Sequence, residues 1–308
     1  MAGIVSIGVH HPSKYSLADL QQLLEISDAE IRRFQRAFGF EEIAMDPEAS
    51  EADLLVPSIE NIPNFNSIRS RIKWVIRART VRHDEPWPSN PLEEVCRRTG
   101  LEQVKRMTIT DYACASGLYS IDLATRLLNR EDENGLILVL TGEKAMTRES
   151  RMIPGIALLG EATAAVVVGK KVNRYKLLGF AALQHPVPGS GLTMNTEASE
   201  YFAKVYADNL DQVVQAALSA ADITTEQVTA YLPHNVSRML SIRTARRWGL
   251  TKNQVLPGTI AQVGHCWSAD PFLNIHDSAI QEQLNAGDKF ILTSVGIGAT
   301  YSAMVVEC

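Results

Sequence analysis

Three side chains in this 308-residue sequence have types and surroundings suited to nucleophilic catalysis. Cys114 stands in "DYACASGLYS" (111–120), His234 follows the apolar run "VTAYLP", and His265 follows Gly264. A cysteine thiolate is a strong nucleophile, and histidine exchanges protons near neutral pH. Alone, each has an ordinary interpretation: a buried packing thiol for the cysteine and structural side chains for the histidines. Together they suggest a Cys-His-His catalytic set.

The residues around Cys114 favour a reactive thiol. The pattern predicts a strand over 106–112 and a helix over 118–130, which places the cysteine at or just before the start of the helix. Unpaired N–H groups and the positive end of the helix dipole lie there, and both favour thiolate over thiol. A substrate has room to approach because the flanking residues are small, namely Ala113, Ala115, Ser116 and Gly117.

A loop with two glycines, "SVGIGATYS" (294–302), is a candidate for binding a substrate oxygen. Gly296 and Gly298 permit unusual backbone angles and a close approach. A backbone N–H in this loop could join that of Cys114 in an oxyanion hole. A plain β-hairpin turn is the alternative interpretation.

A metal site is another alternative for the two histidines. His234, His265 and Cys266 carry ligand atoms, but they lack the compact spacing that is typical of metal-binding motifs. We therefore expect no metal.

The composition is that of a globular protein, with 45% hydrophobic residues, 21% charged residues and a net charge of −5. The negative charge argues against a dedicated nucleic-acid binder. No apolar run approaches the roughly 18 residues of a membrane span, and the N-terminus lacks the basic region of a signal peptide. Four scattered cysteines without a CxxC pair favour free thiols. We therefore expect a cytoplasmic protein that binds neither membrane nor nucleic acid.

Short apolar runs alternate with helical patterns, which predicts an α/β fold. The expected strands are 2–10, 73–80, 106–112, 136–143, 163–169, 228–234, 290–296 and 301–307. The expected helices are 17–36, 118–130, 202–220 and 236–249. The stretch 184–200 is rich in Gly, Pro, Ser and Thr and is expected to be a linker or surface loop.

The sequence also contains an internal repeat. Residues 111–145 run through strand, loop, helix, acidic turn and strand, and residues 262–299 repeat that order with nearly the same spacing. Two further pairs match in the same order, 160–169 with 298–307 and 73–80 with 228–235. Three pairs predict a duplicated α/β unit. In a pseudo-twofold arrangement, the loops that carry Cys114 and His265 would meet at one site.

These motifs resemble the thiolase-fold condensing enzymes, and most closely the β-ketoacyl-[acyl-carrier-protein] synthase III-like group. The resemblance rests on "ACASG" (113–117), "LPHN" (232–235), "GHCWSAD" (264–270) and "GIGATYSAMVV" (296–306), in the order and spacing of that family. It implies a layered α-β-α-β-α architecture. The first half, residues 1–170, would carry the nucleophile, and the second half, residues 171–308, would carry the two histidines.

The resemblance also implies catalytic roles. Cys114 would accept an acyl group as a thioester, and His234 would lie against the thioester carbonyl or help to activate the second substrate. The backbone N–H groups of Cys114 and Ile297 would form the oxyanion hole. Trp87 aligns with the loop that family dimers insert into the partner's acyl pocket, which implies a homodimer.

Further positions align with residues that bind the substrate. Ser237 stands where the family usually has an asparagine that touches the pantetheine arm, and its hydroxyl can still form a hydrogen bond. Gly296 and Gly298 would line the same substrate region. No resident cofactor is implied, because the phosphopantetheine arm of an acyl carrier protein or coenzyme A arrives with the substrate.

Two departures from the family pattern bear on the reaction. His265 stands where synthase III enzymes usually have asparagine. Other condensing enzymes use two histidines, whereas acyltransferases of this group often differ here and use a histidine as general base. The segment "FGFEEIAMDP" (38–47) replaces the Gly-Ile-x-x-Arg segment that helps to grip coenzyme A, which favours a carrier-protein donor.

Four arginines on the helix after His234 could dock such a carrier, since acyl carrier proteins are acidic. Arg243 and Arg247 share a helix face at i,i+4. A solvated helix face is the ordinary alternative. The four residues are Arg238, Arg243, Arg246 and Arg247.

We therefore predict an acyl-thioester enzyme. Cys114 takes an acyl group from a carrier-protein or coenzyme A thioester, and a malonyl-type thioester then decarboxylates and attacks the acyl group in fatty-acid or polyketide-type biosynthesis. The first alternative is an acyltransferase that passes the group to an oxygen, nitrogen or sulfur nucleophile. The second is a non-catalytic partner subunit of a thiolase-fold complex.

Overall fold

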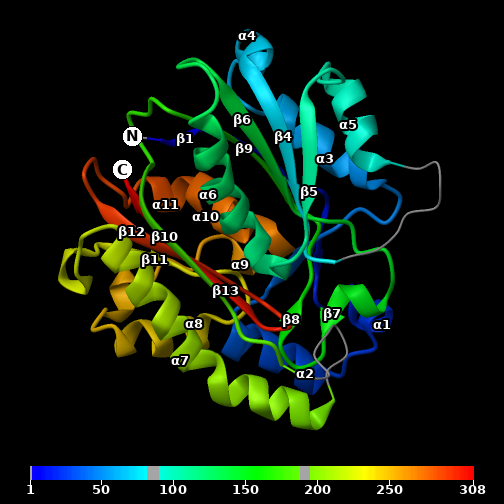
Figure 1. Cartoon of the computed structure of the whole chain (residues 1–308). Coiled ribbons are helices and arrows are strands. Elements are labelled where there is room, and N and C mark those ends of the chain that lie inside the picture. The colour runs from blue at the N-terminus through cyan, green and yellow to red at the C-terminus, as the bar shows by residue number, and fades with distance from the viewer. Residues whose placement is uncertain (1, 82–89, 188–194) are drawn as a thin grey trace.

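The computed structural model describes residues 2–81, 90–187 and 195–308, and within these ranges nine strands form one central mixed sheet (Figure 1). From edge to edge its strands are β11 (Ala230–Leu232), β12 (Lys289–Gly296), β13 (Thr300–Glu307), β10 (Lys176–Gln184), β1 (Gly3–His10), β9 (Thr163–Gly169), β6 (Leu136–Thr141), β4 (Ile72–Ala78) and β5 (Lys105–Ile109).

The sheet consists of two halves with the same strand order and direction. In the first half β5, β4 and β6 are parallel, and β9 is antiparallel between β6 and β1. In the second half β11 and β12 are parallel, and β13 is antiparallel between β12 and β10. Beside β11, Val255 forms a single parallel bridge with Tyr231. This bridge occupies the position next to β11 that β5 occupies next to β4 in the first half. The structure therefore confirms the α/β class and the duplication.

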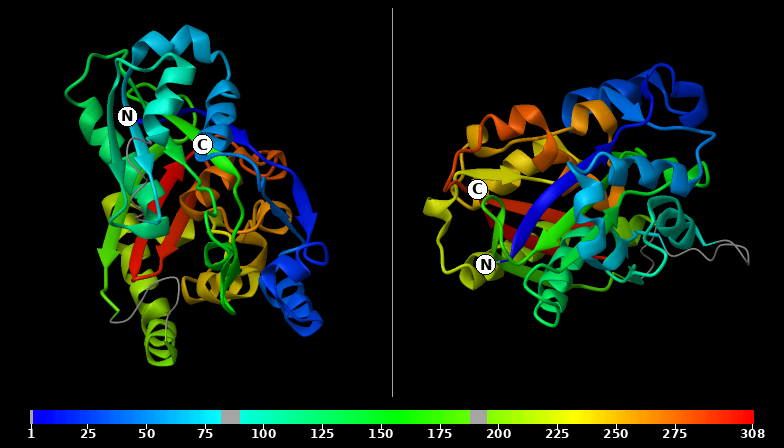
Figure 2. Two further views of the ribbon diagram at one scale, coloured as in Figure 1. Left: turned by 90° about the vertical axis from the view of Figure 1, so that its right-hand side faces the viewer. Right: turned by 90° about the horizontal axis from the view of Figure 1, so that it is seen from above.

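The helices form three layers around the two halves of the sheet. α3 (Glu51–Glu60) packs on β1 and β9 from one outer side, with α5 (Pro91–Thr99) against it, and α7 (Thr196–Ala220) packs on β10 and β13 from the other. α6 (Ser116–Leu128) and α10 (Asp270–His276) contact strands of both halves and form the middle layer. The left view of Figure 2 shows the two outer layers on opposite sides of the molecule.

Three hydrophobic clusters fill the spaces between these layers. The central one joins α6 and α10 to inward-facing residues of both half-sheets, and the outer two lie under α3 with α5 and under α7. Strands β6 and β9 are buried along their whole length, as expected where helices cover both faces of a sheet. A fourth cluster joins the segment before α3 to the loops around the middle layer.

Shorter elements complete the chain. The remaining helices are α1 (Gln21–Leu24), α2 (Asp28–Arg33), α4 (Phe65–Ile68), α8 (Arg238–Arg247), α9 (Ile260–Val263) and α11 (Ser278–Gln281). A π-helical turn, η1, spans Phe34–Phe38, and 3₁₀ turns are η2 (Arg69–Arg71), η3 (Ala113–Ala115), η4 (Glu149–Arg151), η5 (Thr225–Gln227), η6 (Lys252–Gln254) and η7 (Trp267–Ala269). Two small ribbons pair β2 (Lys14–Ser16) with β3 (Glu42–Ala44) and β7 (Met152–Ile153) with β8 (Ala157–Leu158).

The predicted strands all occur, with ends that shift by a few residues, and the predicted helices α6, α7 and α8 occur as well. The helix expected over 17–36 was wrong as one element. Glu25 ends α1 in a left-handed conformation, and Ser27 starts α2 with a capping box to Glu30. The sequence did not predict β10, whose residues are half-buried and show no alternation.

The expected linker over 184–200 was too long. β10 includes Gln184, and α7 begins at Thr196 because the Asn195 side chain accepts a hydrogen bond from the Ala198 N–H. Residues 188–194 lie outside the described ranges. The division of the chain at 170/171 stays a prediction.

Candidate active site

Cys114 lies in η3, directly before α6, and its side chain is buried. The preceding Ala113 has a positive φ of 46°, a left-handed conformation that is rare outside glycine. The Ser294 hydroxyl of β12 donates to the Cys114 carbonyl at 2.8 Å and holds the turn against the second half of the sheet. The cysteine is thus fixed where the two halves of the fold meet.

The hairpin between β12 and β13 supports the same turn. A Cβ atom on Gly296 would lie 2.6 Å from the Ala113 Cβ and 2.8 Å from the Tyr112 carbonyl oxygen, so only glycine allows this approach. Gly298 lines a separate hollow that also includes Asp111 and is not among the residues that line the cavity described below. Ile297, between the two glycines, faces the same cavity as Cys114.

His265 faces the cysteine from the second half of the fold. Its Nε2 lies 3.4 Å from the Cys114 Sγ, and both side chains are buried. η7, which follows His265, packs against η3 across the pseudo-twofold axis. The His265 backbone N–H donates to the Leu158 carbonyl, and its carbonyl accepts from the Gly160 N–H. The predicted meeting of the two repeat loops is therefore observed.

Asp270 completes a chain of three side chains. Its Oδ2 lies 2.5 Å from the His265 Nδ1, and the carboxylate is fully buried. The same carboxylate accepts the backbone N–H of Asn235 and that of Cys266, each at 2.7 Å. These donors satisfy a buried charge that would otherwise be very unfavourable. The arrangement is a Cys-His-Asp triad, in which the carboxylate orients the imidazole.

The triad determines which nitrogen of His265 exchanges a proton. Burial lowers the pKa of His265, but the adjacent Asp270 carboxylate and Cys114 sulfur outweigh burial and raise it to about 10. His265 is therefore cationic at neutral pH, and a cation beside a cysteine favours the thiolate. When His265 loses one proton, Asp270 keeps the hydrogen on Nδ1 and leaves the Nε2 lone pair facing the sulfur.

His234 has different surroundings from His265 although their ring centres are only 5.8 Å apart. Its Nδ1 accepts the Val295 backbone N–H at 3.4 Å, which leaves the hydrogen on Nε2. Burial, reinforced by the cationic His265, lowers the pKa of His234 to about 3 against the opposing effect of Asp270. His234 is therefore a neutral N–H donor. That Nε2 lies 3.4 Å from the Tyr206 Oη of α7.

One cavity of about 330 Å³ joins these groups. Its wall is mostly apolar and includes Cys114, His234, His265, Tyr206 and Ile297. Such a cavity, apolar with a few convergent polar groups, is typical of a small-molecule site. The rest of the wall comes from Phe38, Ile153, Gly155, Ile156, Ser199, Phe202, Ala203, Val236, Ser237, Leu240 and Val295.

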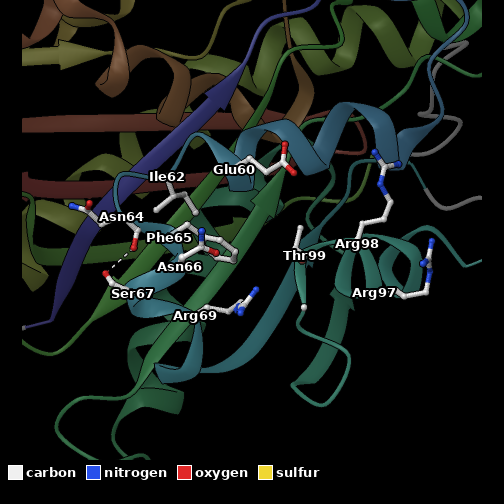
Figure 3. A pocket seen from close by; sticks show the side chains of 11 residues that line it. Glu60, Ile62, Asn64, Phe65, Asn66, Ser67, Arg69, Arg97, Arg98 and Thr99 are labelled. Atoms are coloured by element: carbon white, nitrogen blue, oxygen red, sulfur yellow. Dashed lines mark hydrogen bonds between the residues drawn. The ribbon is translucent and has the colours of Figure 1, made fainter.

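A larger hollow of about 780 Å³ has a different character. It lies between α3, α4 and α5, and Figure 3 shows its polar side chains spread along the wall rather than directed at one point. Its three arginines are exposed or half-exposed, and Arg97 and Arg98 already pair with Glu94 and Asp53. None of its lining residues is a cysteine or histidine, so the smaller cavity is the candidate active site.

The other predicted site residues have mixed positions. Ser237 lines the cavity, and its hydroxyl oxygen accepts the Leu240 N–H as the cap of α8. Arg238 and Arg243 are exposed on α8, whereas Arg247 forms ion pairs with Asp208 and Asp211 of α7. Trp87 lies outside the described residues.

Two residues of the site were not predicted. Asp270 closes the motif "GHCWSAD", and a carboxylate five residues after a candidate catalytic histidine was a signal that could have been followed. Tyr206 gave no signal, because only the packing of α7 brings it to His234. Throughout the described ranges no group of three or more His, Cys, Asp or Glu side chains is arranged to hold a metal ion, and no helix there is long and apolar enough to span a membrane.

Comparisons with known proteins extend over the whole chain. Residues 218–308 match the family described as "3-Oxoacyl-[acyl-carrier-protein (ACP)] synthase III C terminal". A β-ketoacyl-[acyl-carrier-protein] synthase III from Natranaerobius thermophilus is 25% identical over 334 residues, which cover 99% of each chain. The solved 3-oxoacyl-[acyl-carrier-protein] synthase III from Aquifex aeolicus superposes with a TM-score of 0.83 at 18% identity and covers 100% of both chains. A structure described as "ChlB3 [Aceyltransferase]" superposes with a TM-score of 0.84 at 18% identity and covers 99% of this chain and 97% of that one.

Proposed function

Because the chain is a β-ketoacyl-[acyl-carrier-protein] synthase III-like protein of the thiolase fold, we propose that it transfers acyl groups through a thioester on Cys114. The observation that carries this proposal is the Cys114–His265–Asp270 chain in an apolar cavity. Both substrates would be thioesters of a phosphopantetheine arm, carried by an acyl carrier protein or coenzyme A. No resident cofactor takes part.

In the first step the Cys114 thiolate attacks the carbonyl carbon of the donor thioester. The backbone N–H groups of Cys114 and Ile297 stabilise the negative oxygen of the tetrahedral intermediate. The intermediate then expels the donor thiolate, which takes the proton from His265 Nε2. This leaves a neutral His265 with its remaining hydrogen shared with Asp270, and an acyl group on the sulfur.

In the second step a malonyl-type thioester enters the same cavity. Its carboxylate leaves as carbon dioxide, and the resulting enolate attacks the acyl carbonyl and releases the Cys114 thiolate. The enolate oxygen needs hydrogen-bond donors, because negative charge develops there. His234 supports this step, since its N–H is neutral and its tautomer is fixed by the Val295 N–H.

Acyl transfer to an oxygen, nitrogen or sulfur nucleophile is the second candidate. A specific observation favours it: the neutral His265 of the acyl-enzyme presents an Nε2 lone pair beside the acylated sulfur. That lone pair would take the proton of an incoming nucleophile as a general base. Condensation does not require such a base.

Intact mass spectrometry tests the shared first step. The protein is mixed with a panel of acyl-carrier-protein and acyl-coenzyme A donors, and wild type should gain the mass of one acyl group while Cys114→Ala gains none. If no donor gives a mass increase in wild type, the proposal fails and the non-catalytic partner subunit is favoured. Carbon dioxide release from malonyl-carrier protein then supports condensation over transfer to a heteroatom.

A further inference from the structure

Tyr206 has a position that the reaction described so far does not use. It is partly buried in the cavity wall, and its Oη lies 3.4 Å from the His234 Nε2. Because the Val295 N–H occupies the other ring nitrogen, the Nε2–H of His234 donates to the tyrosine oxygen. The phenolic hydrogen is then left for another acceptor.

The hydrogen bonds therefore run in one direction, from the Val295 backbone N–H through the His234 ring to the Tyr206 hydroxyl. Donors aligned in this way polarise one another, so the last O–H is a better donor than an isolated phenol. Both side chains remain neutral, since burial raises the pKa of Tyr206 well above its usual value and lowers that of His234. The relay thus ends in an uncharged donor within the apolar cavity.

Aromatic packing holds Tyr206 in this position. Its ring lies 5.8 Å from Phe202 on the same helix and 6.2 Å from the buried Tyr301 of β13, in edge-on or tilted contacts. Such contacts restrict the ring without engaging its hydroxyl. The hydroxyl is thereby fixed relative to His234 before any substrate enters, as a preorganised donor requires.

We propose that the Tyr206 hydroxyl is a catalytic group that binds the thioester carbonyl oxygen of the malonyl-type substrate, with His234 behind it in the relay as a positioning residue. The Nε2–H of His234 donates to the Tyr206 oxygen, and the Tyr206 O–H is the donor for the enolate. His265 does not supply this donor, because in the acyl-enzyme its Nε2 lone pair faces the sulfur. The inference rests on the proposed condensation.

The balance of the step is complete without any added reagent. The bond from the α-carbon to the carboxylate breaks, its electron pair forms the enolate, and carbon dioxide leaves. The enolate oxygen is held by the Tyr206 O–H, which the His234 N–H polarises. When the α-carbon attacks the acyl carbonyl, a carbon–carbon bond forms, the bond between the acyl carbon and the Cys114 sulfur breaks, and its electron pair stays on the sulfur. The Tyr206 O–H then no longer faces a negative charge.

Tyr206→Phe tests the proposal, with Tyr301→Phe as the matched control, because both changes remove one phenol oxygen from the same aromatic cluster. Two rates are measured for each variant: formation of acyl-Cys114 by rapid quench and mass spectrometry, and carbon dioxide release after malonyl-carrier protein is added. We expect Tyr206→Phe to acylate within about threefold of wild type but to release carbon dioxide about 100-fold more slowly, the lower end of the cost of one oxyanion donor.

Tyr301→Phe should leave both rates close to those of wild type. The double variant His234→Ala/Tyr206→Phe should be little slower than His234→Ala alone, since both residues belong to one relay. If carbon dioxide release is normal in Tyr206→Phe, the inference is refuted and the proposed function stands. If wild type is acylated but does not decarboxylate malonyl-carrier protein, the inference falls while acyl transfer survives. If wild type is not acylated at all, both fail.

Discussion

Asp270→Asn should separate the triad from the rest of the site. The carboxylate lies 2.5 Å from the His265 Nδ1 and also accepts two backbone N–H groups, so an asparagine must turn its NH₂ toward at least one donor. If the amide oxygen keeps the Cys266 N–H, the NH₂ group faces His265. The imidazole then relocates its hydrogen to Nε2, toward Cys114, and can no longer accept the cysteine proton.

The size of the effect follows from the His265 environment. A rise in pKa from 6.5 to about 10 corresponds, at 1.36 kcal/mol per unit, to roughly 5 kcal/mol of preference for the cation. Asp270 is the strongest of the groups that raise the pKa of His265, so its loss removes most of that preference. Even about 1.4 kcal/mol of that preference corresponds to a factor of ten, so alkylation of Cys114 at pH 7 should slow by at least about tenfold.

Iodoacetamide labelling, read by peptide mass spectrometry from pH 5.5 to 9.5, measures this change. Wild-type Cys114 should react at least about tenfold faster at pH 7 than Cys114 of the Asp270→Asn variant. Asp277→Asn is the control, because that carboxylate caps α11 outside the site. Thermal unfolding shows which variants remain folded. An Asp270→Asn protein that is folded and keeps the wild-type profile would refute the triad.

Three further outcomes are expected. Gly117→Ala should lower the free energy of unfolding, measured by urea denaturation, by about 2 kcal/mol, because the new Cβ would lie 2.3 Å from the Ser268 carbonyl oxygen. An unchanged free energy of unfolding would show that this contact relaxes. Arg243→Glu should raise the KM for an acyl carrier protein several-fold and leave kcat unchanged. Arg247→Glu should raise this KM and also lower the stability of the fold, because it breaks the ion pairs with α7. Equal KM values for wild type and Arg243→Glu would exclude docking on α8. Because the pKa of His234 is lowered to about 3 in the fold, the unfolded chain binds more protons than the folded chain between pH 6.5 and about 3. The free energy of unfolding should therefore fall as the pH falls through this range, by up to about 1.4 kcal/mol per pH unit. In denaturant titrations His234→Gln should lose this part of the acid sensitivity, and a pH profile identical to that of wild type would contradict a neutral buried His234.

Much of the fold could be predicted because its signals are local. The fully buried β6 and β9 are continuous apolar runs, and the repeat compares segments of similar length that form equivalent strands. β10 was missed although residues 177–183, "LLGFAAL", form a continuous apolar run that could have been followed; in the fold this strand lies where the two halves join, and all but its last residue are half-buried. The helix over 17–36 failed because a capping box at Ser27 interrupts an otherwise helical pattern.

The site was predicted in part because some of its signals, like those of the fold, are local in the sequence. Cys114, His234 and His265 stand in motifs whose order along the chain is fixed, and their convergence follows from the duplication. Their different protonation could not be predicted, because it depends on groups that only folding brings near. Asp270 acts on His265 through one short contact, and the Val295 backbone N–H acts on His234 through another.

The two histidines show why residue identity alone does not define the chemistry here. Their rings are 5.8 Å apart in one apolar cavity, and both are buried. A carboxylate holds His265 as a cation next to Cys114, whereas a backbone N–H and burial hold His234 as a neutral donor. Environments that push the pKa values of neighbouring groups in opposite directions are how one site assigns proton transfer to one group and hydrogen-bond donation to another. The position of His265 beside Cys114 is therefore inseparable from Asp270: the carboxylate fixes one imidazole nitrogen, and the other faces the sulfur. If the proposed condensation takes place, the donor for the enolate must come from elsewhere in the cavity wall, where Tyr206 meets His234.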